Sequence, residues 1–463
     1  MKPISIFGTS SDAGKSTLTF VIGKILQDLG YSVAPFKAQN VSNNSHVTDD
    51  GSEIAIAQYF QAQVLGVPTS YHLNPVLLKS GSGNRASMIV KGKVVEEKDV
   101  REYYRDLDLL KPAVDECFEY LQSRYDCVVC EGAGSPVELN LMDKDLSNIY
   151  IATRFETKII LVADIERGGV FASIWGVYNL LPEALRANVI GVIVNKFRGD
   201  MSLFDEGVKI IEERFKIPVL GVLPYGHLNL GFEDSASLMN YSQNKTDTKI
   251  TVGVIAYPTM SNYNDIEPLI ADEEVMVEFI TANVSLESYD LIILPGSKLV
   301  IQDLRWLKKI GLYDRLQKHT KAIYGICGGY QMMFQSIDDP YAIESQQSDS
   351  EDALGWIDDT IVLEKEKKLS KGSYDLFNDR VSGFEIRHGE SQKKQLWFDE
   401  KAVRGSFVHA LLENNSFRTR YFQTLNCTYI GYDFQNRKDQ ILNQFIQECR
   451  VKLDIERILN HVL

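Results

Sequence analysis

The sequence is short of positive charge, a feature that proteins binding nucleic acids or anionic membranes usually have. Lys and Arg number 49 against 63 Asp and Glu, which gives a net charge of −14 at pH 7. Such an excess of negative charge repels polyanions and argues against a general nucleic-acid or membrane surface. Any site for an anionic substrate must therefore be locally basic.

Long apolar runs and paired cysteine motifs are also scarce. No apolar run approaches the roughly 20 residues of a membrane-spanning helix, and the chain enters a strand-like run at once, without a basic and apolar leader. Of six cysteines only Cys127 and Cys130 form a C-x-x-C pair, inside an apolar run typical of a buried strand. This pattern indicates core thiols rather than a zinc site, and we expect a soluble protein of the reducing cytoplasm.

The length of 463 residues is too great for one core and predicts two or three domains. In the first half, apolar runs such as "PISIFG", "KIILVAD" and "VIGVIVN" alternate with longer amphipathic segments, which is typical of parallel strands joined by helices. A polar stretch, "MNYSQNKTDTK", interrupts this α/β pattern before a shorter one begins. We expect one α/β domain at 1–240, a linker at 241–249 and a second α/β domain at 250–463. The charged stretches 344–352 and 364–371 are expected to be solvated surface.

The stretch "GTSSDAGKST" resembles a phosphate-binding loop with one residue too many, because five residues rather than the usual four separate Gly8 from Gly14. It follows a strand-like run and opens a helix-like one. Backbone N–H groups and the positive end of the helix would face phosphates, while a lysine adds a point charge and a hydroxyl reaches Mg²⁺. The predicted nucleotide-binding residues are Thr9, Ser10, Asp12, Ala13, Gly14, Lys15, Ser16 and Thr17.

Two further strand ends would complete this site. Glu131, in "CEGAGSPVELNL", is predicted to hold Mg²⁺ together with Ser16, with capping of the next element as the alternative. Asn195, in "VIVNKFRGD", resembles the base reader of GTPases. Arg198, however, stands where an acidic residue would contact guanine, and arginine cannot accept hydrogen bonds. We therefore predict that the Asn195 amide recognises adenine, which makes ATP and Mg²⁺ the expected cofactors.

Basic side chains at strand ends are candidates for binding an anionic substrate. Arg167 and Arg198 rank first because each lies in a loop that contains glycine and follows a strand. Lys37, Arg85 and Lys196 are further candidates, although each alone is more often an ordinary surface residue.

The second half of the chain has the features of a cysteine hydrolase. "AIYGICGGYQMMF" places Cys327 between a strand and a helix, flanked by Gly325, Gly328 and Gly329. This arrangement is typical of a nucleophile elbow, in which the helix N-terminus lowers the thiol pKa. The sequence suggests no packing reason for the three glycines.

A thiolate nucleophile needs a base and an oxyanion hole. His409, in "GSFVHALLEN", is the predicted base, with His388 as its competitor, since such partners are adjacent in the fold rather than in the sequence. The N–H groups of Gly328 and Gly296 are predicted to hold the oxyanion. An ATP site joined to a glutaminase-like site suits an enzyme that makes ammonia and attaches it to an activated carboxylate.

Over nearly the whole chain, the order of these motifs resembles the cobyric acid synthases, glutamine-dependent amidases of the corrin pathway. The motifs are "GTSSDAGKSTL", "PFKAQNVSNNS", "NPVLLKSGS", "EGAGSPVELNL", "DIERGGVFASIWG", "VNKFRGD", "PVLGVLPY", "SNYNDIEPL", "LPGSKLVIQDLRWL", "YGICGGYQMM" and "GFEIRHGE". The resemblance implies a P-loop domain similar to dethiobiotin synthetase, whose loop has the same extra residue. A class I glutamine amidotransferase domain would follow, with Cys327 as nucleophile and His409 as base.

The activity that the resemblance implies is ATP- and Mg²⁺-dependent amidation of the b, d, e and g carboxylates of adenosylcobyrinic acid a,c-diamide. L-Glutamine would donate the nitrogen and cobyric acid would be the product. The partner would be this small-molecule corrinoid, with no nucleic acid or membrane, and the oligomeric state is left open. Alternatives are the a,c-diamide synthase of the same pathway, an amidase of a cell-wall lipid precursor, and a P-loop switch protein with an inactive glutaminase-like domain.

Three positions depart from the pattern of the resembled family. Ala410 follows the predicted base where the family has glycine, and Leu411 stands where an H-x-E acid would lie. Arg387 replaces the family's histidine, which argues against a catalytic role for His388. Glu385 is then the remaining candidate to orient His409.

Overall fold

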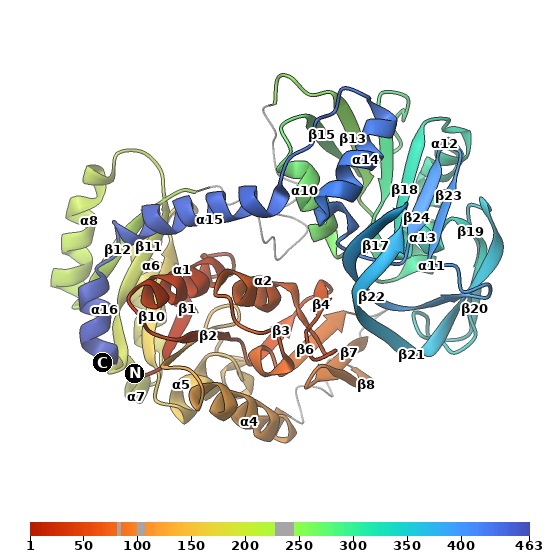
Figure 1. The fold of residues 1–463 in the computed structure, drawn as a ribbon. Helices are drawn as coiled ribbons and strands as arrows, with labels where there is room; N and C mark the ends of the chain where they lie inside the picture. Colours follow the sequence, from red (N-terminus) through yellow and green to blue (C-terminus); the bar gives the residue numbers. More distant parts are fainter. Residues whose placement is uncertain (81–84, 100–106, 227–244) are drawn as a thin grey trace.

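The computed structural model describes residues 1–80, 85–99, 107–226 and 245–463, which form two α/β bodies side by side (Figure 1). Each body is built around a six-stranded sheet, and two smaller sheets of the first body lie on its side toward the second. The predicted α/β class with parallel sheets is confirmed.

The first sheet contains β1 (Ile4–Gly8), β2 (Val33–Phe36), β9 (Cys127–Glu131), β10 (Lys158–Asp164), β11 (Val189–Phe197) and β12 (Val219–Pro224). All its pairs are parallel, in the order β12-β11-β10-β1-β9-β2. Cys127 and Cys130 are buried free thiols in β9, as expected. Because parallel strands end at one edge of a sheet, this topology brings Gly8, Glu131 and Asn195 together.

Helices cover both faces of this sheet with their apolar sides. They are α1 (Lys15–Asp28), α2 (Ile56–Val64), α4 (Lys111–Gln122), α5 (Ile149–Arg154), α6 (Val170–Leu180), α7 (Glu183–Arg186) and α8 (Asp205–Ile210). Apolar residues of α1 share a core with β1, β9 and β10, while α6 packs against the opposite face of β10 and β11. Burial on both faces explains why these strands are continuous apolar runs rather than alternating ones.

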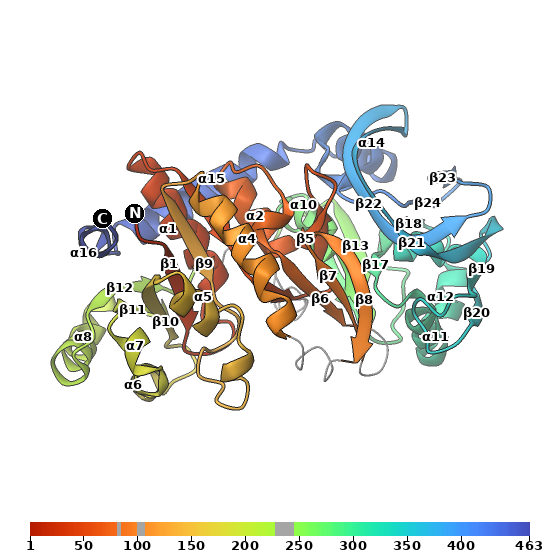
Figure 2. The same ribbon diagram turned by 90° about the horizontal axis from the view of Figure 1, so that it is seen from below.

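Two small sheets extend the first body toward the second (Figure 2). They contain β3 (Gln39–Val41), β4 (Ser45–Val47), β5 (Glu53–Ala55), β6 (Val76–Ser80), β7 (Arg85–Val90) and β8 (Lys93–Asp99). One is ordered β3-β6-β7-β8, and the other is the antiparallel pair β4-β5, which leads directly into α2. The "PFKAQNVSNNS" motif thus runs from the central sheet to the boundary between the bodies.

The second body has a six-stranded sheet of its own, ordered β15-β13-β16-β18-β24-β23 and parallel except for the last pair. Its strands are β13 (Ile250–Ile255), β15 (Val275–Ile280), β16 (Leu291–Leu294), β18 (Ala322–Ile326), β23 (Trp397–Glu400) and β24 (Val403–Ser406). Its helices are α10 (Glu267–Ile270), α11 (Val300–Ile310), α12 (Leu312–Lys318), α13 (Gly328–Gln331) and α14 (Asn415–Leu425).

A long hairpin of the second body reaches the first. The remaining strands of this body are β14 (Met260–Ser261), β17 (Gly296–Ser297), β19 (Phe334–Asp339), β20 (Asp349–Asp352), β21 (Ile357–Leu376) and β22 (Asp379–Ser391). In the hairpin of β21 and β22, Lys367 is 12% exposed and its Nζ lies 2.7 Å from Oε2 of Glu53. The expectation that all of 364–371 is solvated is therefore wrong, because this lysine pairs with a buried carboxylate of the first body.

The last two helices, α15 (Phe434–Arg450) and α16 (Ile455–Val462), return to the first body (Figure 1). Leu442 and Ile446 join the core that contains β1 and α1, and the N–H of Lys2 donates to the carbonyl of Val462 at 2.7 Å. The C-terminal end of the predicted domain 250–463 thus packs with the first body rather than with the second. Part of the predicted linker, 241–244, lies outside the described residues. No helix in the described ranges has the length and apolar character to cross a membrane.

Candidate active sites

The phosphate loop, Thr9 to Gly14, connects β1 to α1. Gly14 has a φ of 104°, and a Cβ there would come 2.2 Å from Nδ2 of Asn195, so that only glycine fits. A Cβ at Gly8 would likewise come 2.8 Å from Nζ of Lys15, which donates to the Ser10 carbonyl at 3.2 Å. Both glycines therefore make room for polar side chains at the loop.

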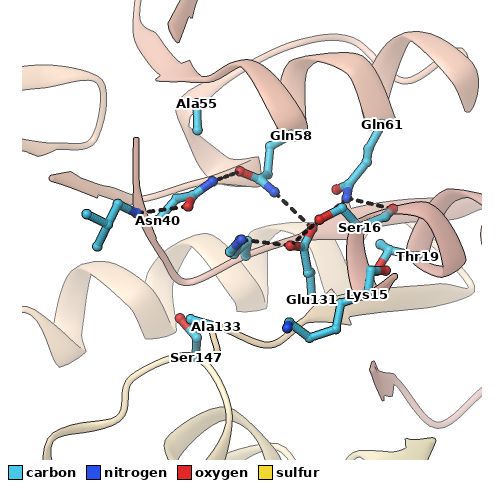
Figure 3. A network of polar contacts seen from close by, with 12 residues as sticks. Lys15, Ser16, Thr19, Asn40, Ala55, Gln58, Gln61, Glu131, Ala133 and Ser147 are labelled. Carbon is cyan, nitrogen blue, oxygen red and sulfur yellow. Dashed lines mark hydrogen bonds and ion pairs between the residues drawn. The ribbon is translucent and has the colours of Figure 1, made fainter. Parts of the chain in front are cut away.

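Glu131 is 1% exposed at the end of β9 and accepts hydrogen bonds from four side chains (Figure 3). Its Oε1 accepts from Oγ of Ser16 and Nζ of Lys37, each at 2.7 Å. Its Oε2 accepts from Nε2 of Gln61 at 2.6 Å and of Gln58 at 3.2 Å, both from α2. A buried carboxylate needs such partners because an unpaired buried charge is costly. The carboxylate thus faces the start of α1 rather than capping the next element.

The donor set around Glu131 fits Mg²⁺. Hydroxyl and carboxylate oxygens are the ligands that this ion prefers, and Ser16 and Glu131 supply one of each. Oε1 of Gln61 is buried beside them without a hydrogen-bond partner among the described residues, so it could accept from a metal-bound water. Within the described ranges no group of three or more His, Cys, Asp or Glu could hold a metal. Phosphate oxygens and water would therefore complete the coordination.

Asn195 and Lys196 support the phosphate loop from the end of β11. Nδ2 of Asn195 donates to the carbonyl of Ala13 at 2.9 Å. Nζ of Lys196 donates to the carbonyl of Asp12 at 2.5 Å and to Oδ2 of Asp164 at 3.0 Å. The Asn195 amide therefore faces the loop backbone, and adenine recognition by this residue stays a prediction.

Arg167 and Arg198 lie near the same edge of the sheet, with side chains 61% and 55% exposed. Arg167 pairs with Oδ2 of Asp12 at 3.2 Å, and Arg198 pairs with Oε1 of Glu166 at 2.7 Å. The first contact places Arg167 directly beside the phosphate loop. Substrate binding by both arginines stays a prediction, and the side chain of Arg85 lies outside the described part of the chain.

Cys327 occupies the turn between β18 and α13, with φ of 49° and ψ of −102°. A non-glycine residue in such a conformation costs of order 1–3 kcal/mol, which the surrounding structure must offset. Its N–H donates to the carbonyl of Ser406 at 2.8 Å, and its Sγ lies 3.7 Å from the carbonyl oxygen of Ile386. The turn has the predicted elbow geometry at the start of a helix.

The glycines of the elbow have packing roles that the sequence did not reveal. A Cβ at Gly329 would come 1.9 Å from the carbonyl oxygen of Leu294, and one at Gly328 would come 2.5 Å from the nitrogen of Ser297. At Gly325 it would come 2.6 Å from a methionine methyl group. The expectation that these glycines have no packing reason is therefore wrong, because neighbouring backbone approaches too closely for a side chain.

His409 is buried near Cys327 and is held by Asp265. Nδ1 of His409 lies 2.7 Å from Oδ2 of Asp265, whose Oδ1 accepts the N–H of Ala410 at 2.6 Å. The other ring nitrogen, Nε2, is buried and has no hydrogen-bond partner of normal geometry in the part of the chain that the structure describes. Burial lowers the pKa of His409, but the negative charges of Asp265 and of an ionised Cys327 outweigh it and raise the pKa to about 10. An imidazolium beside a thiolate is the activated form of a Cys–His pair.

Gly296 lies beside the His409 ring. It pairs with Ser261 in the short sheet of β14 and β17, and a Cβ there would come 3.4 Å from Cε1 of His409. The oxyanion role of Gly296 and Gly328 stays a prediction. His388, the competing base, uses its Nδ1 to contact the carbonyl of Glu364 at 3.0 Å, and burial lowers its pKa to about 4.

A cavity of about 450 Å³ lies next to the cysteine site and is lined by residues of both bodies. His46 and Tyr59 come from the first body, and Phe384 and Ala410 come from the second. Since Ala410 directly follows His409, the cysteine site lies at the boundary between the two bodies.

The two halves of the chain match two different domain families. Residues 4–229 match the CobQ/CobB/MinD/ParA nucleotide binding domain, and residues 251–417 match the CobB/CobQ-like glutamine amidotransferase domain. A relative from Acinetobacter baylyi, "Cobyric acid synthase", is 62% identical over 462 residues, which cover 100% of this chain and 99% of the relative. The chain belongs to the cobyric acid synthase family.

Other cobyric acid synthases are similar over most of their length. The one from Anoxybacillus flavithermus is 40% identical over 440 residues, 90% of this chain and 87% of the relative. One from Clostridium botulinum is 36% identical over 490 residues, 99% of both chains. These relatives and the two domain matches confirm the resemblance and the predicted order of a nucleotide-binding domain and an amidotransferase domain.

Sequence reasoning missed Asp265. This residue lies in a short 3₁₀ helix, Tyr263–Ile266, within the cobyric acid synthase motif "SNYNDIEPL", 144 residues before His409. The prediction that Glu385 orients His409 is wrong, because Oε2 of Glu385 accepts from Nε of Arg387 at 2.9 Å instead. The motif that contains Asp265 was the only available signal for it. Spacing along the sequence cannot locate an acid that lies so far from its histidine partner.

Proposed function

We propose that this member of the cobyric acid synthase family amidates the b, d, e and g carboxylates of adenosylcobyrinic acid a,c-diamide to give cobyric acid. The observation that carries the proposal is that one chain combines a phosphate loop facing Glu131 with a buried Cys327–His409–Asp265 set. The full-length relative at 62% identity supports cobyric acid synthesis over the related amidations. A catalytic rather than a switch role follows from the intact cysteine site.

L-Glutamine is hydrolysed at Cys327. The thiolate adds to the side-chain amide carbon, and the N–H groups of Gly328 and Gly296 hold the resulting oxyanion. His409 donates a proton to the leaving nitrogen as the C–N bond breaks, which releases ammonia and leaves a glutamyl thioester. His409, now neutral, takes a proton from the water that hydrolyses this thioester to glutamate. Asp265 keeps Nδ1 of the ring protonated, so that Nε2 makes both proton transfers.

ATP binds on the loop from Thr9 to Thr17 and activates the corrinoid carboxylate. The carboxylate attacks the γ-phosphorus to give an acyl phosphate and ADP, and ammonia then displaces phosphate to form the amide. Lys15 and the loop N–H groups stabilise the phosphates, and we assign attraction of the substrate carboxylates to Arg167 and Arg198. Bound Mg²⁺, held by Ser16 and Glu131, would neutralise charge on the phosphates.

The two reactions are divided between the two halves of the chain. We assign ATP-dependent ligation to 1–240, the connection to 241–249 and glutamine hydrolysis to 250–463, with α15 and α16 supporting the first body. Ammonia passes between the sites without protonation, because ammonium is a poor nucleophile. The position of the cysteine site at the domain boundary supports this transfer. We place the enzyme in the cytoplasm, where ATP and glutamine are available.

Replacing the nucleophile tests the division of labour. Cys327→Ser should abolish amidation with glutamine but leave amidation with a high concentration of ammonium salt within about two-fold of the parent, since the ATP site is separate. Product formed from the a,c-diamide, ATP and Mg²⁺ is measured by mass spectrometry. Equal loss of both activities in a folded variant would contradict the two-site scheme.

A further inference from the structure

The first body supplies hydrogen bonds that support the cysteine site of the second. The N–H of Asn262 donates to Oδ1 of Asn44 at 2.7 Å, and the N–H of Ser45 donates to Oδ1 of Asn262 at 3.1 Å. All three residues are buried. Buried polar groups of this kind are costly to leave unpaired. The two hydrogen bonds therefore fix the position of one body relative to the other at this point.

Asn262 connects these hydrogen bonds to the residue that holds His409. It begins the 3₁₀ helix Tyr263–Ile266, and its carbonyl accepts the N–H of Asp265 at 3.2 Å. Asn262 has a φ of 53°, a left-handed conformation that a non-glycine residue keeps only when its surroundings require it. Because Asn44 and Ser45 bind Asn262 from the first body, they help to fix the position of Asp265.

An aromatic stack supports His409 from its other side. The rings of Tyr59 and His46 are 3.5 Å apart and nearly parallel, with an interplanar angle of 12°. His46 also contacts Phe384 at 3.8 Å, and Phe384 stacks on His409 at 5.0 Å and 18°. Burial lowers the pKa of His46 to about 3, so this ring packs in its neutral form. The stack runs from α2 of the first body to His409 of the second.

We propose that Asn44 is a positioning residue for glutamine hydrolysis. It lies in the first body and acts on His409 through Asn262 and Asp265, so the amidotransferase half depends on the nucleotide-binding half for the geometry of its own site. The inference rests on the proposed hydrolysis of glutamine at Cys327. It assigns a function to Asn44 and Ser45 at the end of the "PFKAQNVSNNS" motif.

Substitution of Asn44 tests the inference in the full-length enzyme. Asn44→Ala should lower kcat for glutamine hydrolysis at least about ten-fold, since small displacements of a catalytic group are costly. KM for glutamine should stay within about two-fold, because the altered contact lies behind the His409–Asp265 pair. Asn44→Asp keeps the accepting oxygen and should recover most of the lost kcat. Asn43→Ala is the matched control, because Oδ1 of Asn43 has no hydrogen-bond partner within the described ranges.

Ammonium-driven amidation distinguishes a local effect from a folding defect. This ammonium-driven amidation should be unchanged in Asn44→Ala. A kcat for glutamine hydrolysis equal to that of the parent in the same variant would overturn the inference. If Asn44→Ala loses both activities, Asn262→Gly decides, because glycine accepts the φ of 53° and lacks the side chain whose Oδ1 accepts from Ser45, one of the two contacts by which the first body holds Asn262. A reduced kcat for glutamine hydrolysis in Asn262→Gly supports the inference, and an unchanged kcat overturns it. Absence of glutaminase activity in the parent would instead contradict the proposed function.

Discussion

At the scale of the residue, the carboxylate of Asp265 raises the pKa of His409 more than any other group does. It accepts from Nδ1 at 2.7 Å and also accepts the N–H of Ala410, so the ring orientation and its tautomer are both fixed. Leu411, two residues after the base, stands at the H-x-E position and cannot do this because its side chain is apolar. The acid that orients His409 therefore comes from another part of the domain.

The variant Asp265→Asn keeps the size of the side chain but removes its charge. We expect kcat for glutamine hydrolysis to fall by about 10²- to 10⁴-fold, the range that general acid–base catalysis contributes. A coupled assay for glutamate measures the effect. Amidation driven by ammonium salt should be retained, and a variant with normal glutaminase activity would show that Asp265 has no such role.

Asp265→Asn should also change how the free energy of unfolding depends on pH. The folded-state pKa of His409 is raised to about 10 from 6.5, so its protonation stabilises the fold fully below about pH 6.5, and this stabilisation is lost as the pH rises through about 10. The difference in unfolding free energy between the parent and Asp265→Asn should therefore shrink between these pH values. Urea unfolding at pH 6.5 and 9.5 measures it, and a constant difference would contradict the assigned pKa.

At the scale of the element, the phosphate loop depends on the fit between Gly14 and β11. Gly14→Ala would place a methyl group 2.2 Å from Nδ2 of Asn195 at a φ of 104°. We expect ATP binding and amidation to be lost while glutamine hydrolysis continues within about two-fold, because the defect is confined to the first body. Titration calorimetry measures ATP binding. Gly176→Ala in α6, where a Cβ meets no described residue within 4 Å apart from its own stretch of helix, is the matched control, and ATP binding by Gly14→Ala would contradict this reading.

Local elements were predictable from the sequence, and long-range partners were not. The spacing of Gly8, Gly14 and Lys15 indicates the phosphate loop because these residues act within one turn of the chain. The glycines around Cys327 indicate the elbow for the same reason. Asp265 was missed because nothing local marks it as a partner of His409. The return of α15 and α16 to the first body was missed because an apolar helix face predicts burial but not the surface that it covers.

At the scale of the whole molecule, a buried ion cluster joins the two bodies. Glu53 is fully buried, and its carboxylate lies 2.6 Å from Nζ of Lys79 in the first body and 2.7 Å from Nζ of Lys367 in the second. Burial opposes ionisation of Glu53, but the two ammonium groups hold its pKa below the usual range. Breaking such a cluster typically costs about 3–5 kcal/mol, so it resists separation of the bodies. Such a cluster would hold the two sites in a fixed arrangement during the proposed transfer of ammonia.

The central claim is that nitrogen released at Cys327 is attached to the corrinoid at the phosphate loop. It is tested by incubating the enzyme with the a,c-diamide, ATP, Mg²⁺ and glutamine labelled with ¹⁵N in its side-chain amide, in the presence of unlabelled ammonium at a concentration too low to drive amidation in Cys327→Ser. Mass spectrometry then counts the label in each amidated product. The account predicts four successive amidations that retain the label. Products carrying unlabelled nitrogen, or no amidation of the corrinoid, would contradict it.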